Sequence, residues 1–150
     1  MQTIEQAVEA HNSGDLNGAA EICRAILKSK PQDLAALHLL AVVMSDAGLN
    51  EQAVGFFESA LALGGPDSAI LHNYGVALQA LGQLDQAARA FRHAAEAAPL
   101  RTDSWYNLGE TELLRDNPAA AILAFEKVLE QNPGSPEARN NLSISLRKDG

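Results

Sequence analysis

The chain has 150 residues and carries 19 acidic against 11 basic side chains, a formal net charge of −8. This balance argues against binding to nucleic acid or to an anionic membrane surface, because both need clustered Lys and Arg. A single cysteine permits no internal disulfide and fits a reducing compartment. No apolar run is long enough for a signal peptide or a membrane span, so we expect a cytoplasmic protein.

A small residue recurs every 34 residues along the whole chain. The five positions are Gly14, Gly48, Gly82, Asp116 and Gly150. A fixed period in this range indicates a repeat solenoid, in which similar units stack one on the next. Each small residue is expected to end a helix with a left-handed backbone, which Gly adopts freely and Asp tolerates.

Each period contains two stretches long enough for a helix, so the predicted unit is a helical hairpin. The chain opens with a weak helix over Thr3–Ser13. In the third period, helices over Ser68–Leu81 and Asp85–Ala98 flank Gly82, and a helix over Ser135–Gly150 closes the chain. No segment alternates with the period of two that is typical of a half-buried strand, so we predict an all-α fold.

Some helix starts can be predicted from their capping residues. Asp67 and Thr102 are suitable N-caps for the first helices of the third and fourth periods. Asn117, followed by Pro118, is suitable for a second helix, because proline favours the first helical position.

Other residue types also recur every 34 residues. We number each period so that the recurring small residue is position 15, and we call the residues at one position a column. Small residues at positions 8 and 20 would let the two helices of a hairpin approach closely. A large residue at position 24 would fill the space that they leave, with Cys23 taking this place in the first period. The columns are Ala7, Ala41, Gly75, Gly109 and Ser143 at position 8; Ala19, Ala53, Ala87 and Ala121 at position 20; and Cys23, Phe57, Phe91 and Phe125 at position 24.

These columns resemble the W-x2-L-G-x2-Y…A-x3-F…P pattern of the tetratricopeptide-repeat family. The fourth period carries most of the pattern, in Trp105, Leu108, Gly109, Ala121, Phe125 and Pro133. The resemblance implies one domain over residues 1–150, a right-handed superhelical solenoid of four hairpins (1–33, 34–67, 68–101 and 102–135) with a capping helix over 136–150. Glu112 departs from the pattern, because an aromatic residue or leucine is usual there.

In proteins of this kind, the exposed side of the first helices lines a concave groove. Position 6 on that side is asparagine in three successive periods, at Asn73, Asn107 and Asn141. A row of amides offers hydrogen-bond donors and acceptors to the backbone of an extended peptide. It resembles the asparagine ladder of the O-linked N-acetylglucosamine transferases. The alternative is that asparagine is only a frequent consensus choice at this position.

Other groove positions add apolar and aromatic groups. Position 9 includes Val42 and Val76 and forms a mostly apolar strip, which is either a contact for a ligand's side chains or an ordinary exposed surface. Position 5 holds His38, His72 and Tyr106. Two histidines without a third ligand in phase do not predict a metal site.

The fourth period makes one part of the groove acidic and aromatic. Tyr106 and Glu110 lie one turn apart, with Asp103 on the same face. This surface is expected either to bind a basic or polar residue of a ligand or to be a solvated face. A clamp for a terminal carboxylate is not expected, because only Arg147 and Lys148 in the last helix would serve it.

Catalysis has little support, and no cofactor or metal is expected. Cys23 belongs to the core column and is expected to be inert, while the bases of the second helices, Arg24, Lys28, Arg89 and Arg92, are expected to be solubilising charge. We therefore predict a non-enzymatic scaffold that binds a protein or peptide in its groove. One alternative is the substrate-recruiting arm of a larger enzyme, since the repeats are similar to those preceding catalytic domains in bacterial glycosyltransferases, sulfotransferases and methyltransferases. Another is self-association through the C-terminal helix, where Leu142 and Leu146 would stack on a second copy.

Overall fold

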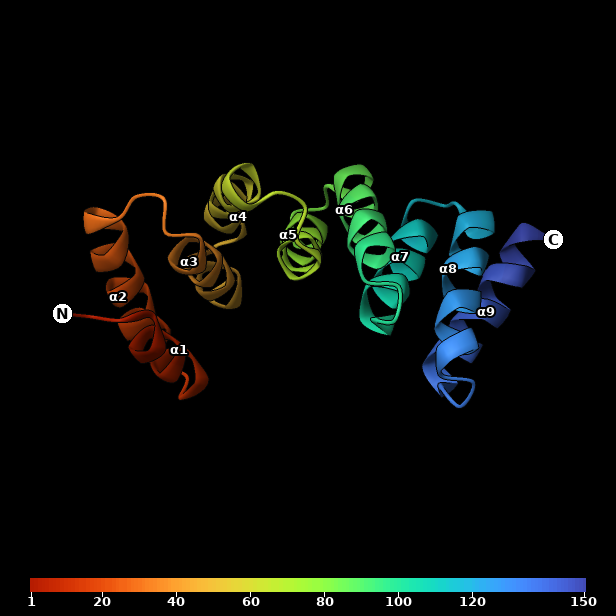
Figure 1. The fold of residues 1–150 in the computed structure, drawn as a ribbon. Helices are drawn as coiled ribbons and strands as arrows, with labels where there is room; N and C mark the ends of the chain where they lie inside the picture. The colour runs from red at the N-terminus through yellow and green to blue at the C-terminus, as the bar shows by residue number, and fades with distance from the viewer.

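The computed structural model describes all residues from 1 to 150 and consists of nine α-helices joined by short turns. The first eight pair into four hairpins, and α9 packs on the last of them (Figure 1). The predicted all-α repeat architecture is thus confirmed. The helices are α1 (Ile4–Asn12), α2 (Leu16–Ser29), α3 (Leu34–Asp46), α4 (Asn50–Gly64), α5 (Ser68–Ala80), α6 (Leu84–Ala97), α7 (Thr102–Leu114), α8 (Pro118–Gln131) and α9 (Pro136–Asp149).

The turn inside each hairpin has the left-handed backbone predicted from the 34-residue spacing. The φ angle is +85° at Gly14, +77° at Gly48, +71° at Gly82 and +56° at Asp116. Asp116 is the one residue other than glycine with a positive φ. Aspartate tolerates a left-handed backbone better than most residues other than glycine, so the fourth hairpin keeps the same turn.

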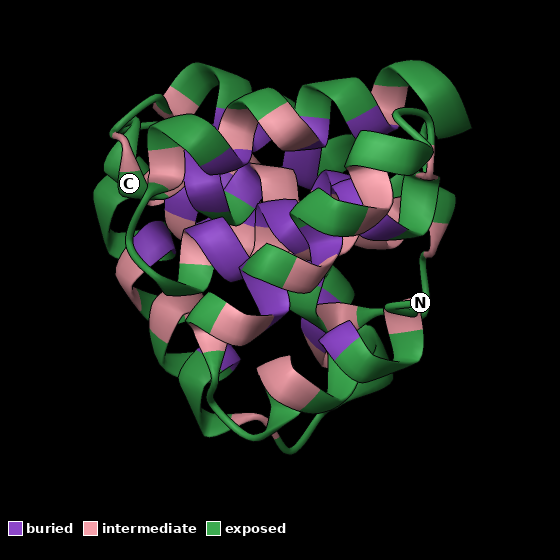
Figure 2. Cartoon of the chain, turned by 90° about the vertical axis from the view of Figure 1, so that its left-hand side faces the viewer, coloured by how far each residue is buried: buried purple, intermediate pink, exposed green.

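The small residues at position 8 permit the close packing that their column predicts. A Cβ atom built on Gly75 would lie 2.7 Å from Cε1 of Phe91, and one on Gly109 would lie 2.6 Å from Cζ of Phe125. Each phenylalanine ring therefore occupies the space that a side chain at position 8 would need. Phe57, Phe91 and Phe125 are fully buried, and the buried residues gather inside the stack (Figure 2).

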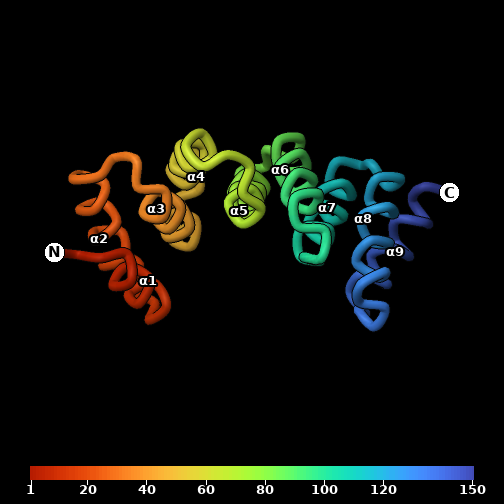
Figure 3. The backbone as a smooth tube through the Cα atoms, viewed as in Figure 1, coloured from red at the N-terminus to blue at the C-terminus, as the bar shows by residue number.

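The odd-numbered and even-numbered helices lie on different sides of the stack. Besides its neighbours in sequence, α1 contacts α3, α3 contacts α5, and α7 contacts α9. In the backbone view, α4 and α6 lie along the top of an arch, with α3 and α5 beneath them (Figure 3). The odd-numbered helices thus form the inner wall, and the predicted groove residues all belong to this wall. None of the helices is both long enough and apolar enough to cross a membrane.

The helix caps agree with the sequence in part. The Asp67 carboxylate accepts hydrogen bonds from the backbone N–H groups of Ala69 and Ile70, as an N-cap should. Thr102 was wrongly predicted as a cap, because α7 already includes it and Arg101 occupies the N-cap position. Asn117 does cap α8 by position, but its side-chain amide donates to Glu112 instead of receiving a helix N–H.

Glu112 forms a buried ionic cluster where the family pattern expects an apolar side chain. Its carboxylate is fully buried and accepts hydrogen bonds from Arg92 Nη2 at 2.9 Å, Arg115 Nη1 at 2.7 Å and Asn117 Nδ2 at 3.1 Å. The prediction that Arg92 is merely solubilising charge is therefore wrong. It joins α6 to α7, because a buried carboxylate must be paired to offset the loss of its hydration.

Candidate binding groove

The structure places all nine predicted groove residues on the inner wall formed by α3, α5, α7 and α9. Eight of them are half-buried, and Val76 is 37% exposed. Partial burial leaves each side chain with one surface held by the protein and another free to meet a ligand. These residues are His38, Val42, His72, Asn73, Val76, Tyr106, Asn107, Glu110 and Asn141.

The position-5 rings form a column that rests on the buried phenylalanines. Within each of the last three hairpins, a ring of the first helix meets the position-24 ring of the second. The centroid separations are 6.2 Å for His38 and Phe57, 5.6 Å for His72 and Phe91, and 5.7 Å for Tyr106 and Phe125. The rings meet in tilted or edge-on arrangements, which aromatic pairs prefer. These contacts fix the distance between the inner wall and the core.

The same rings also hydrogen-bond to the next odd-numbered helix. His38 Nε2 lies 3.3 Å from Asn73 Nδ2 on α5, and Asn141 Nδ2 on α9 donates to the Tyr106 hydroxyl at 3.0 Å. By this pattern, His72 would meet Asn107. Its Nδ1 instead lies 2.9 Å from the hydroxyl of Ser104, which is also on α7.

The three asparagines of the predicted ladder are consequently not equivalent. Asn73 and Asn141 each use an N–H inside the protein, whereas the side chain of Asn107 has no hydrogen-bond partner in the structure. Asn107 is half-buried on α7, between the other two. It therefore offers its whole amide to a ligand at the middle of the row.

Burial keeps the two groove histidines in their neutral form. Desolvation lowers the pKa of His38 and of His72, against an opposing attraction from Asp67 and Asp103 respectively. Both rings are therefore largely uncharged at pH 7. No group of three or more His, Cys, Asp or Glu side chains is placed to hold a metal ion.

Cys23 lies in the core, as its column predicts. Its side chain is fully buried, and burial raises the pKa of the thiol to about 11. A protonated, buried thiol has little nucleophilic character, which agrees with an inert packing role.

A pocket of about 420 Å³ lies at the C-terminal end of the inner wall. Two of its six lining residues, Glu110 and Asn141, belong to the groove residues predicted from the sequence, and the other four do not. These others occupy positions 12 and 13 of their helices, which face the same side as positions 6 and 9. The lining residues are Gln79 on α5, Glu110, Leu113 and Leu114 on α7, and Asn141 and Lys148 on α9.

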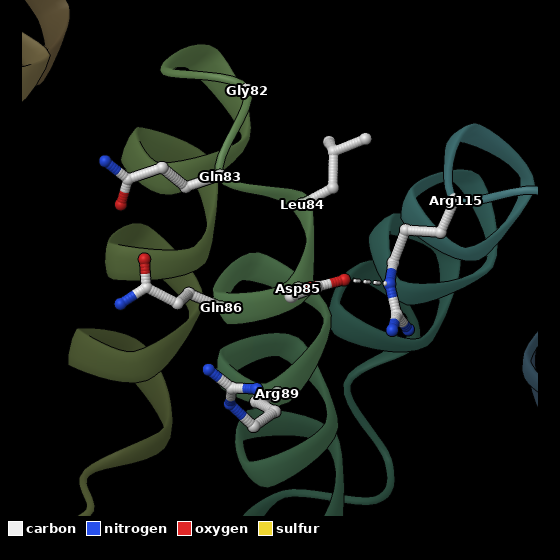
Figure 4. Close-up of a pocket in the computed structure, with 7 residues that line it drawn as sticks. All are labelled: Gly82, Gln83, Leu84, Asp85, Gln86, Arg89 and Arg115. Atoms are coloured by element: carbon white, nitrogen blue, oxygen red, sulfur yellow. Dashed lines mark hydrogen bonds and ion pairs between the residues drawn. The ribbon is translucent and has the colours of Figure 1, made fainter.

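A second pocket, of about 570 Å³, has none of the predicted groove residues in its lining (Figure 4). It is lined by residues 82–86 and by Arg89 and Arg115. Arg115 Nε already donates to Asp85 at 2.8 Å, while Gln83, Gln86 and Arg89 are exposed. Asp85 and Arg115 are paired with each other, and the other polar side chains of this pocket, including the unpaired Arg89, are exposed, whereas most of the groove residues are half-buried.

Comparison with known proteins agrees with this geometry. A family model described as tetratricopeptide repeat matches residues 75–148. The crystal structure of MamA superposes with a TM-score of 0.91 at 22% identity, over 98% of this chain and 80% of that one. The chain folds as a tetratricopeptide-repeat solenoid. YrrB, described as a TPR protein with an unusual peptide-binding site, has the same fold at a TM-score of 0.89 and 21% identity, over 97% of this chain and 75% of that one.

Curated proteins also match parts of the solenoid. The peroxisomal targeting signal receptor of Candida albicans is 36% identical over 80 residues, which is 51% of this chain and 14% of the receptor. The BBSome complex member bbs-4 of Caenorhabditis elegans is 26% identical over 131 residues, which is 87% of this chain and 28% of that protein. The solenoid thus spans less than a third of the length of these relatives.

Proposed function

We propose that the inner wall of the solenoid binds an extended segment of a partner protein and carries out no catalysis. The observation that carries this proposal is the unpartnered amide of Asn107 in the middle of the row of groove residues. An amide left free on a half-buried surface has both a donor and an acceptor to give to a peptide backbone. Relatives named for a targeting-signal receptor and for a peptide-binding site support the same class of function.

The groove would bind the partner by two kinds of contact. Asn107 would hydrogen-bond the partner's backbone, while Val42 and Val76 on α3 and α5 would cover its apolar side chains. The neutral rings of His38 and His72 complete a surface with little charge in this half of the groove. Asn73 and Asn141 would mainly hold neighbouring helices in register, because Asn73 already donates to the His38 ring and Asn141 to the Tyr106 hydroxyl.

The test is Asn107→Ala, compared with Asn17→Ala on the exposed side of α2. Binding would be measured on an array of short peptides of alternating valine and serine, varied one position at a time. We expect Asn107→Ala to weaken binding by about 1–2 kcal/mol, because it strands a hydrogen-bonding group of the peptide. Asn17→Ala should leave binding unchanged. Equal binding by both variants would refute the proposal.

Self-association is a second candidate, favoured by one observation on α9. This helix packs on α8 and contacts α7, and its Leu146 is 52% exposed. If α9 stacks on a second copy, sedimentation should show a dimer that Leu146→Glu dissociates. A monomer in both proteins would eliminate this candidate. None of the relatives described above is named as a transferase, so the recruiting-arm alternative gains no support from them.

A further inference from the structure

We propose that the pocket formed by α5, α7 and α9 binds the charged end of a lysine or arginine side chain of the partner segment, with Glu110 as its counter-ion. This inference rests on the proposed groove function and names the chemistry that the groove would select. It follows from the pairing of the acids, from the hydrogen bonds of the pocket amides and from the walls of the pocket.

Glu110 differs from the other acids of α7 in having no base beside it. Asp103 accepts from Arg101 Nη2 at 2.8 Å, and Glu112 is held by Arg92 and Arg115. Glu110 forms no ion pair, although it is half-buried. A half-buried carboxylate without a counter-ion is partly stripped of water, so a cation that approaches it gains more than it would at a fully exposed acid.

The polar groups around Glu110 are arranged as acceptors. Gln79 donates an N–H to Thr111 at 3.2 Å and Asn141 donates one to Tyr106 at 3.0 Å, which leaves both amide oxygens without a partner. A site with a carboxylate and two free amide oxygens suits the multiple N–H donors of an ammonium or a guanidinium.

Two carboxylates act on the Tyr106 hydroxyl at this end of the groove. Burial, followed by the charge and hydrogen bonding of Glu110, raises the pKa of Tyr106, and Glu137 on α9 adds to the effect. The phenol therefore stays protonated and neutral, so the negative charge near it comes from the carboxylates of Glu110 and Glu137.

The apolar walls fit the stem of a long basic side chain. Leu113 is half-buried and Leu114 is 63% exposed, and both line the pocket. Lysine and arginine carry methylene stems that cover apolar surface while their charged ends reach polar groups. A volume of about 420 Å³ leaves room for such a side chain together with water.

Lys148 is the one cation that lines the pocket. A Lys148 variant therefore distinguishes a pocket that binds a cation from one that binds a carboxylate. Lys148 is exposed and forms no ion pair with Glu110. If the ligand is a cation, Lys148 repels it, so Lys148→Ala should leave binding unchanged or tighten it. If the pocket instead takes a carboxylate, Lys148→Ala should weaken binding and Glu110→Gln should strengthen it.

The experiment uses the whole chain and two small probes, n-butylguanidinium and pentanoate. Binding would be followed by NMR through the side-chain amides of Gln79 and Asn141 and the methyl groups of the two leucines. We expect saturable shifts with n-butylguanidinium and none with pentanoate. Glu110→Gln should weaken the guanidinium about tenfold, as expected for a lost hydrogen bond to a charged group. Glu126→Gln, which removes an exposed acid of α8, should have no effect.

Three outcomes would overturn the inference: no saturable shift with n-butylguanidinium, equal binding by Glu110→Gln and wild type, or pentanoate binding that Lys148→Ala abolishes. The peptide array separates this inference from the proposed function. Peptides that bind through Asn107 without preferring Lys over Gln or Glu would refute the inference alone. A guanidinium site in a chain that binds no peptide would refute the groove function and leave the cation preference of the pocket intact.

Discussion

The two halves of the inner wall share one backbone plan but differ in chemistry. On α3 and α5 the groove groups include neutral histidines and valines. On α7 and α9 they include a carboxylate without an ion pair and a phenol, and α7 also carries Glu112 of the buried ion cluster. Since the turns and the ring packing recur in both halves, the repeat can vary its polar side chains widely without changing the scaffold.

The largest expected effect on the free energy of unfolding comes from the buried ion cluster of the C-terminal half. Arg115→Ala should destabilise the chain by about 3 kcal/mol, because it leaves Glu112 buried with less charge compensation. Glu112→Leu should be neutral or stabilising, because it places an apolar side chain in the buried site, exposes Arg92 to water and leaves Arg115 paired with Asp85. Urea unfolding would measure both changes.

The control is the surface pair between Lys127 and Glu130, whose side chains are 49% and 61% exposed. Lys127→Ala should cost no more than about 1 kcal/mol, because exposed ion pairs contribute little. If Arg115→Ala and Lys127→Ala cost the same, the buried cluster is not a distinctive feature of the C-terminal half.

Both halves pack a glycine of the first helix against a phenylalanine ring of the second. We therefore expect the same intermediate loss of stability when either glycine is replaced. Gly75→Ala and Gly109→Ala should each destabilise by about 1–3 kcal/mol, since the new methyl group would overlap a buried phenylalanine ring. Thermal unfolding would measure this cost. Gly55→Ala on α4 meets no atom within 4 Å, so it should stabilise its helix by up to about 1 kcal/mol. Markedly unequal costs at Gly75 and Gly109 would show that the scaffold itself differs between the halves.

The smallest expected effect is the pH dependence of the N-terminal half. The pKa values of His38 and His72 are lowered in the folded chain, so the unfolded chain binds more protons just below pH 6.5. The contribution of the two neutral rings to the free energy of unfolding is therefore fully present above the pKa of histidine in the unfolded chain. It is lost as the pH falls through the lower pKa values of the folded chain.

The double variant His38→Gln, His72→Gln should therefore lose less stability on acidification than the wild type, as measured by urea unfolding across this pH range. NMR titration of each ring would place its pKa directly. A pKa of His38 or His72 at or above 6.5 would contradict the assignment of neutral rings to this half of the groove.

The sequence by itself determined the repeat, its hairpins and the wall on which groove residues lie. Small residues at fixed positions leave few backbone arrangements, so Gly75 and Phe91 imply their contact from spacing alone. Only the tertiary structure decided how the polar side chains pair, because those pairs join different helices, 20 residues apart for Arg92 and Glu112 and 32 for His72 and Ser104, and their rotamers depend on several neighbours at once. Thus His72 hydrogen-bonds to Ser104 and leaves the Asn107 side chain without a partner, Glu112 pairs with Arg92, and Glu110 forms no ion pair.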